Sequence, residues 1–205
     1  MGRPRTNDET VKERLVVCAT EMLATRPQES VTLRALAAAA GASTTAVYSL
    51  FGGKDGLIRA VRDRAVEGLF QDVSAVPASE DPLADIHALA VAYRRWGCGH
   101  RHLYTVLFGG VQSFEPTGAV GGRDPIGPLV AAIERGVSGA VLAGEATSIA
   151  LSLWVTLHGL VTLELAGALD ARTAEAAFRP TFQAALRGWT TPTVFRGLRS
   201  TETAP

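Results

Sequence analysis

Residues Thr32–Lys54 read TLRALAAAAGASTTAVYSLFGGK, and this stretch decides how the N-terminal part of the chain folds. Leucines and alanines recur at helical spacing up to Gly41, where a residue without Cβ can adopt the positive φ that a sharp reversal needs. Thr32 and Ser43 are N-cap candidates, because a hydroxyl can accept a hydrogen bond from a free N–H of the first turn. The stretch therefore predicts two short helices joined by a tight turn.

The second of these helices, residues 44–51, has two different faces. Val47 and Phe51 are four residues apart and can pack inward, whereas the opposite face carries hydroxyl groups and no charge. A helix-turn-helix needs such a protruding second helix, because the helix must enter a major groove about 12 Å wide. Gly52 and Gly53 allow close backbone approach, and Lys54 can meet a phosphate beside the next helix N-terminus.

A family resemblance lies in residues 32–57, read as T-x-R-x-L-A-x-x-A-G-A-S-x-x-x-V-Y-x-x-F-x-x-K-x-x-L. This segment resembles the DNA-binding segment of the tetracycline-repressor (TetR) family of bacterial regulators, and the likeness extends back to a first helix at about residues 8–25. The alternative is a helical hairpin with no DNA role. The residues expected to contact DNA are Thr32, Arg34, Ser43, Thr44, Thr45, Tyr48, Ser49 and Lys54. We expect Arg34 and the two threonines to reach bases, and Tyr48 and Lys54 to meet phosphates.

The charge and cysteine content set limits on the partners. Lys plus Arg and Asp plus Glu both number 20 in 205 residues, so the chain has no overall basic field. Basic residues modestly exceed acidic ones in the first quarter, which suits a small phosphate footprint and salt-sensitive binding. Cys18 and Cys98 stand in unrelated contexts, which argues against a disulfide framework or a structural zinc site and fits a reducing cytoplasm.

One segment, residues 149–169, is long and apolar enough to suggest a membrane span. It contains His158 and Glu164, and ionisable groups inside a membrane are costly. We therefore expect a buried helix of a soluble bundle. Residues 1–10 are polar, so no signal peptide is expected, and a cytoplasmic location follows.

The fold class predicted from the hydrophobic periodicity is all-α, with about nine helices and no strand. The expected helices span residues 8–25, 33–40, 44–51, 54–73, 83–96, 102–108, 125–141, 145–168 and 171–189. Gly97-Cys98-Gly99 is expected to interrupt the chain after the fifth helix, and residues 109–124 to form a loose glycine-rich loop. The expected domains are a helix-turn-helix domain (1–56), a linking helix (57–76), a ligand-binding and dimerisation domain (77–190) and a poorly ordered tail (191–205).

A second resemblance lies in Trp154-x-x-x-His158-Gly159, which is similar to the Trp-x-x-x-His-Gly signature of one TetR-type C-terminal domain class. Residues 93–96 and 102–108 fit the same pattern. Members of that class usually have a proline before the short sixth helix, where this chain has His100-Arg101-His102 after two glycines. Together the two resemblances cover residues 8–189.

The C-terminal part has the composition of a small-molecule site, because a helical bundle with an apolar and aromatic lining and few polar groups commonly binds one. The low charge indicates a mainly apolar effector, with Arg95 or His158 able to hold one polar group. The alternative is that each aromatic residue belongs to the core. The candidate ligand-binding residues are Tyr93, Trp96, Tyr104, Phe108, Phe114, Trp154 and His158.

Catalysis and metal binding are not predicted. His158 has no His, Cys, Asp or Glu at i+3 or i+4, so metal-ligand spacing is absent. No Gly-x-Ser-x-Gly elbow, phosphate loop or carboxylate pair is present either. We therefore expect no enzymatic activity, no metal and no cofactor, and a hydrogen-bonded His158 near a pocket or the dimer core.

The last two expected helices, residues 145–168 and 171–189, carry many alanines and glycines that allow close helix contact, so we expect them to form a homodimer interface. Two reading helices about 34–36 Å apart would match a palindromic site in double-stranded DNA. The sequence thus predicts a homodimeric regulator, a repressor that a small effector releases from its operator. The alternative is a helical small-molecule- or partner-binding protein without DNA readout, because residues 44–51 contain no Arg, Lys, Gln or Asn.

Overall fold

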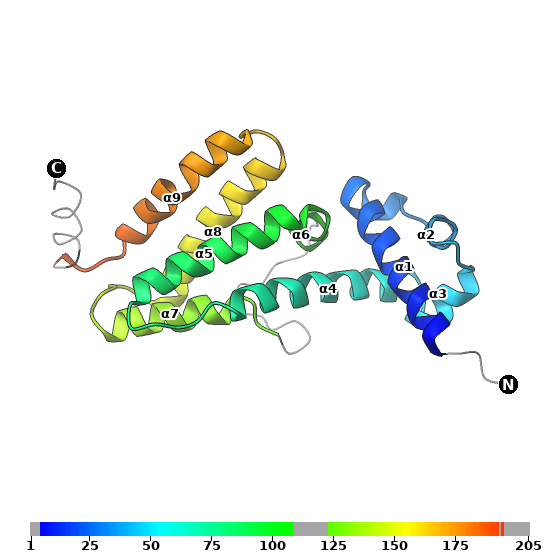
Figure 1. Ribbon diagram of the computed structural model, residues 1–205, viewed down its shortest axis with the longest axis horizontal. Coiled ribbons are helices and arrows are strands. Elements are labelled where there is room, and N and C mark those ends of the chain that lie inside the picture. The colour runs from blue at the N-terminus through cyan, green and yellow to red at the C-terminus, as the bar shows by residue number, and fades with distance from the viewer. Residues whose placement is uncertain (1–4, 109–122, 193, 195–205) are drawn as a thin grey trace. The chain divides into compact units, whose positions relative to one another are not determined.

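The computed structural model describes residues 5–108, 123–192 and 194. Within them the chain is helical and has no strand, although Leu142 and Thr190 form an isolated bridge, and this confirms the all-α prediction (Figure 1). The elements are α1 (Arg5–Thr25), η1 (Gln28–Ser30), α2 (Leu33–Ala39), α3 (Thr44–Phe51), α4 (Lys54–Ser74), α5 (Pro82–Gly99), α6 (Arg101–Phe108), α7 (Gly127–Ser138), α8 (Ala146–Leu165) and α9 (Ala171–Arg187). The expected loop at 109–124 and tail at 191–205 lie almost wholly outside the described residues.

The described residues form two compact units. The first comprises residues 5–68 and 100–108 with Arg123, and the second comprises residues 69–99, 124–192 and 194. The helix α6, which the sequence analysis assigned to the ligand-binding domain, packs against α1 of the first unit, where Val106 is buried in the same cluster as Leu15.

The helix α5 differs from its prediction at its C-terminal end. It continues through Gly97 and Cys98 to Gly99 instead of stopping at residue 96. Gly97 is buried, so its missing side chain suits a closely packed position. An interior glycine costs a helix only about 1 kcal/mol relative to alanine, which tertiary packing can offset.

The core of the first unit holds the helical hairpin in place. Val47 is the buried residue of α3, and it packs with Leu36 of α2 and Leu57 of α4. Thr32 Oγ1 accepts a hydrogen bond from Ala35 N at 3.2 Å, and Ser43 Oγ accepts one from Ala46 N at 3.1 Å. Gly41 joins the two helices at φ 60°. The predicted caps and turn are therefore present.

Gly56, in the first turn of α4, lies directly against the end of α3. A Cβ built at this position would stand 1.7 Å from the Phe51 carbonyl oxygen. Because that neighbour is backbone, it cannot rotate away as a flexible side chain could. The absence of a side chain at residue 56 is thus required for the close approach of α3 and α4.

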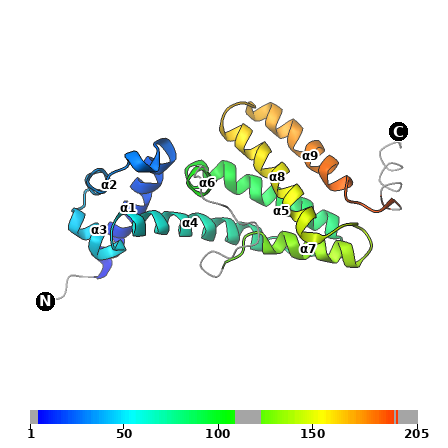
Figure 2. The ribbon, with the colours of Figure 1, turned by 180° about the vertical axis from the view of Figure 1, so that it is seen from behind.

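The second unit is a helical bundle in which α5 packs against α7 and α8, and α8 also packs against α7 and α9. In both views of the ribbon, α8 and α9 run side by side (Figures 1 and 2). The largest fully buried side chains of this unit are Trp96, Phe182, Leu69, Ile86, Ile133, Leu142, Ile149 and Leu153.

Asp85 fixes the segment that leads into α5. The residue is 5 % exposed, and its carboxylate accepts hydrogen bonds from Ser79 N (2.9 and 3.1 Å) and Ser79 Oγ (2.7 Å). The guanidinium of Arg135 on α7 also pairs with it. These donors, the Ser79 backbone N–H foremost, hold the pKa of Asp85 below its usual value.

The helix α8 is the one described helix that is long and apolar enough, by length and composition, to cross a membrane. Only 28 % of its most apolar window is buried within the chain. Leu151, Val155 and Leu163 are 44 %, 54 % and 47 % exposed, respectively. The expectation of a buried helix therefore holds for one face of α8, while a second apolar face is open.

We expect Gly56→Ala to destabilise the protein by about 1–3 kcal/mol, because the added methyl overlaps the Phe51 carbonyl. Urea unfolding followed by circular dichroism measures the loss. Gly99→Ala is the matched control, since a Cβ there meets nothing within 4 Å. Equal stability of Gly56→Ala and wild type would show that α3 and α4 do not approach as described.

We expect Asp85→Asn to cost on the order of 1–3 kcal/mol at pH 7, because an amide cannot accept all the bonds from Ser79 and Arg135. The native carboxyl has a lowered pKa, so its contribution is complete above about pH 4 and declines as the pH falls toward the native pKa. Unfolding free energies of both proteins between pH 7 and pH 3 test this. A gap that stays constant over that range would contradict the role of the charge.

Candidate nucleic-acid interface and ligand sites

The outward face of α3 consists of hydroxyl-bearing side chains. Thr44, Thr45, Tyr48 and Ser49 are all exposed, and Tyr48, at 62 %, is the most exposed large hydrophobic residue among those that the structure describes. This face is open to solvent because Val47 is the only residue of the eight-residue helix that is buried. The structure thus brings four of the predicted DNA-contact residues together on one uncharged surface.

Three further predicted contacts flank this surface. The side-chain oxygens of Thr32 and Ser43 accept the cap bonds at the helix starts, which leaves each hydroxyl hydrogen available to an outside acceptor. Arg34 is exposed in the first turn of α2 and has no ion pair within the described residues. Its guanidinium is therefore available to bases or phosphates.

The region after α3 is held by contacts that the sequence analysis did not anticipate. Lys54 Nζ donates to the Gln28 carbonyl at 2.8 Å, and Arg62 Nη2 donates to Gln28 Oε1 at 3.3 Å. Gln28 thus links η1 to α4. The Tyr48 ring lies against Gly53, where a Cβ would stand 3.3 Å from Cε1. An ammonium has three donors, so Lys54 keeps two N–H groups for a phosphate.

Three of the predicted ligand-binding residues meet in the second unit. The His158 ring stacks on Trp154 with centroids 5.2 Å apart, and its Nδ1 lies 3.5 Å from Tyr93 Oη. Its Nε2 lies 3.4 Å from Thr162 Oγ1. Burial lowers the pKa of His158, so the imidazole is neutral at neutral pH.

The other predicted ligand-binding residues lie elsewhere. Trp96 is 1 % exposed in the core of the second unit. Tyr104 and Phe108 contact each other in the first unit, with centroids 4.7 Å apart. Phe114 lies outside the described residues. The seven residues therefore do not line one pocket within the described parts of the chain.

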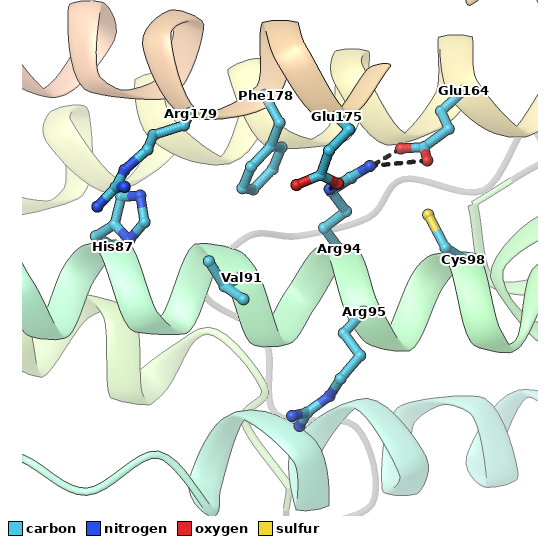
Figure 3. A pocket seen from close by; sticks show the side chains of 9 residues that line it. All are labelled: His87, Val91, Arg94, Arg95, Cys98, Glu164, Glu175, Phe178 and Arg179. Atoms are coloured by element: carbon cyan, nitrogen blue, oxygen red, sulfur yellow. Dashed lines mark hydrogen bonds and ion pairs between the residues drawn. The ribbon is translucent and has the colours of Figure 1, made fainter. Parts of the chain in front are cut away.

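A pocket of about 640 Å³ lies between α5, α8 and α9, and none of the seven predicted residues lines it (Figure 3). Arg95, which the sequence analysis singled out as a polar contact, is on its border. The lining residues are His87, Val91, Arg94, Arg95, Cys98, Glu164, Glu175, Phe178 and Arg179.

Arg94 is the central charge of this pocket. Its Nε and Nη2 donate to the two carboxylate oxygens of Glu164 at 2.9 and 3.0 Å, and its Nη1 donates to Glu175 at 2.5 Å. The guanidinium also lies 5.0 Å from the centroid of the Phe178 ring. Hydrogen bonding to Glu164 raises the pKa of Arg94, and the same bonds lower the pKa of Glu164. Both groups are therefore ionised at neutral pH.

The Cys98 thiol, which also lines this pocket, is not activated as a nucleophile. Burial, followed by the nearby Glu164, raises the pKa of Cys98 to about 11, so this thiol is protonated and weakly nucleophilic at neutral pH. Among the residues that the structure describes, no three His, Cys, Asp or Glu side chains are grouped to hold a metal ion.

Known proteins share both the sequence pattern and the fold. Residues 15–61 match the model of bacterial regulatory proteins of the tetR family, and residues 86–188 match that of the tetracyclin repressor-like C-terminal domain. An uncharacterised HTH-type transcriptional regulator of Mycobacterium tuberculosis is 27 % identical over 172 residues, which cover 82 % of this chain and 76 % of that protein.

Solved structures show the same fold. The TetR family transcriptional regulator PfmR from Thermus thermophilus has a TM-score of 0.68 and 20 % identity, covering 85 % of this chain and 97 % of its own. A TetR-like transcriptional regulator from a Rhodococcus species has a TM-score of 0.67 and 20 % identity, covering 91 % and 98 %. The architecture of the chain is therefore that of helix-turn-helix regulators.

Proposed function

Because the chain belongs to the tetracycline-repressor family of DNA-binding transcriptional regulators, we propose that it is a homodimeric repressor released from a palindromic operator by a small, mainly apolar effector. The proposed DNA contacts are supported chiefly by the exposed hydroxyl face of α3. N-cap hydrogen bonds at Thr32 and Ser43 fix the starts of α2 and α3. Regulators of this family bind operators and form dimers. The contact residues, the sign of regulation and the effector are the parts proposed here.

We assign the proposed base and phosphate contacts from the chemistry of each side chain. Thr44, Thr45 and Arg34 read base edges, while Tyr48 and Lys54 contact phosphates. A threonine offers a donor, an acceptor and a methyl group, all of which can discriminate bases in the major groove. Thr32, Ser43 and Ser49 donate hydroxyl hydrogens to phosphates at the edge of the footprint. Phosphate contacts position the protein, whereas base contacts specify the sequence.

The proposed effector binds in the second unit, with Tyr93, Trp154 and His158 as its aromatic and polar contacts. The neutral His158 between Trp154 and Tyr93 could hold one polar atom of an otherwise apolar ligand. An effector that binds better to the DNA-free state must weaken DNA binding. Bound DNA then weakens effector binding by the same factor. We propose no enzymatic step for this site, and a cytoplasmic location for the protein.

The proposed dimer interface is formed by α8 and α9. Leu151, Val155 and Leu163 lie on an open face of α8, and a contiguous exposed apolar patch marks an interaction site. Gly159 lies on the same face, and a Cβ there would meet nothing within 4 Å. Small side chains at this position allow a second helix to approach closely. Residues 1–56 would then contact DNA, and residues 77–190 would bind effector and partner.

Selection from a random duplex pool with the full-length protein at moderate salt tests the proposed DNA readout. We expect a palindrome with two equivalent halves about one helical turn apart. Thr45→Val removes one hydroxyl at nearly constant volume, so it should cost about 1–3 kcal/mol on the selected site and relax one position in each half. Recovery of non-specific binding alone would contradict readout by α3.

Lys54→Gln should weaken binding to all duplexes alike and reduce the slope of log affinity against log salt by about one per protomer. Arg95→Gln on α5 is the charge-matched control: Arg95 is exposed in the second unit and lies on neither proposed interface, so both quantities should stay unchanged. Because Lys54 also bonds to Gln28, thermal unfolding of each variant must first show a folded N-terminal unit. A change in the preferred sequence would contradict the phosphate role.

Val155→Asp should weaken the dimer on the order of 100-fold, because it places an unpaired charge in the proposed apolar interface. Sedimentation equilibrium measures the change, and affinity for the palindrome should fall more than affinity for a half-site. Val17→Asp is the control, since Val17 is similarly exposed at 41 % but lies on α1. Dimers of unchanged strength in Val155→Asp would exclude this face as the interface.

A further inference from the structure

The pocket between α5, α8 and α9 has two ends of different chemistry (Figure 3). At one end Arg94 lies between two carboxylates. At the other end His87 and Arg179 lie beside each other. Val91 and Phe178 stand between the two ends and provide an apolar wall.

The Arg94 end has its charges matched. Arg94 and Glu164 are 16 % and 17 % exposed and share two parallel hydrogen bonds. Glu175 takes up a further donor of the same guanidinium and is itself 75 % exposed. A charged ligand gains little at this end, because the charge of the one guanidinium there is already balanced by two carboxylates.

The His87 end has donors without acceptors. Arg179 is exposed on α9 and, within the described residues, has no hydrogen bond or ion pair. His87 Nε2 is buried and has no hydrogen-bond partner in that part of the chain. Burial, and secondly the charge of Arg179, hold the pKa of His87 below its usual value, so the ring is neutral and one of its nitrogens carries a proton. The Arg179 guanidinium is thus available to donate, and the His87 ring beside it has hydrogen-bonding capacity that the chain leaves unused.

We propose that this pocket binds a small monocarboxylate with an apolar body. The carboxylate accepts hydrogen bonds from Arg179 and His87, and the body lies on Val91 and the Phe178 ring. Val91 is 43 % exposed, so a ligand that covers it removes apolar surface from water. The volume of about 640 Å³ is in the range of small-molecule pockets.

The charges nearby favour a single negative charge over a phosphate. Glu175 precedes Arg179 by one helical turn on α9, so a doubly charged group would be repelled more strongly than a carboxylate. Arg95 does not add a second cation, because it pairs with Asp72 at 3.3 Å and points away from the other lining side chains (Figure 3). The single positive charge of Arg179, beside a neutral imidazole, therefore suits a ligand with one carboxylate.

This pocket is separate from the proposed effector site. None of Tyr93, Trp154 and His158 lines this pocket, and ligand binding can be measured without DNA. Binding of a carboxylate with no change in DNA affinity would leave the site intact and would show only that this ligand is not the effector.

Isothermal titration of the full-length protein with 2-naphthoate and its neutral isostere 2-naphthamide, at pH 7 and without DNA, tests the proposal. We expect 2-naphthoate to bind at least about 10-fold more tightly, because only the carboxylate gains charge-assisted hydrogen bonds. Arg179→Gln should bring its affinity down to that of the amide. Arg172→Gln, the same change on the same helix but outside the pocket, should not.

Val91→Asp is a second variant that keeps the ion pairs and the fold, because residue 91 is exposed on α5. It places a negative charge on the apolar wall and should remove measurable 2-naphthoate binding. The proposal is overturned if acid and amide bind equally, if neither binds at millimolar concentration, or if Arg179→Gln behaves like Arg172→Gln.

Discussion

The burial of Val47 is the contact on which the hairpin depends. An eight-residue helix is too short to be stable in water by itself. Ordering the backbone of its first turn costs more free energy than its few hydrogen bonds contribute. The helix α3 therefore relies on its neighbours: Leu36 and Leu57 enclose Val47, and the backbone of α4 approaches α3 so closely that only glycine fits at residue 56. Anchoring one side chain inward leaves the whole hydroxyl face outward.

The second unit contains charged side chains within a bundle of apolar helices, and these side chains pair with one another. Arg94 on α5 donates hydrogen bonds to Glu164 on α8 and Glu175 on α9, so one guanidinium links three helices. Asp85 does the same for α5 and α7 through Arg135. A buried ion pair contributes modestly to stability when complete and costs much when one partner is lost, so such pairs specify which helices are neighbours more than they strengthen the fold.

The hairpin was predictable from sequence and the α5–α8–α9 pocket was not, for a physical reason. The caps at Thr32 and Ser43 and the turn at Gly41 act over three or four residues, so local spacing reveals them. Arg94 and Glu164 are 70 residues apart, and periodicity alone does not say which helix faces which. The aromatic residues predicted to share a site were divided between two units for the same reason: α6 packs on α1, which nothing in its own eight residues indicates.

The open apolar face of α8 makes the stability of the protein depend on its concentration in the cell. A helix with Leu151, Val155 and Leu163 in water gains stability when a second copy covers them, and that gain follows mass action. In the dimer that we propose, folding and pairing are thermodynamically linked, so the melting temperature would rise with protein concentration and dilute chains would be the most vulnerable to proteolysis. Control by this regulator would therefore have a threshold in its own abundance, because occupancy of a two-fold site falls steeply once pairs dissociate.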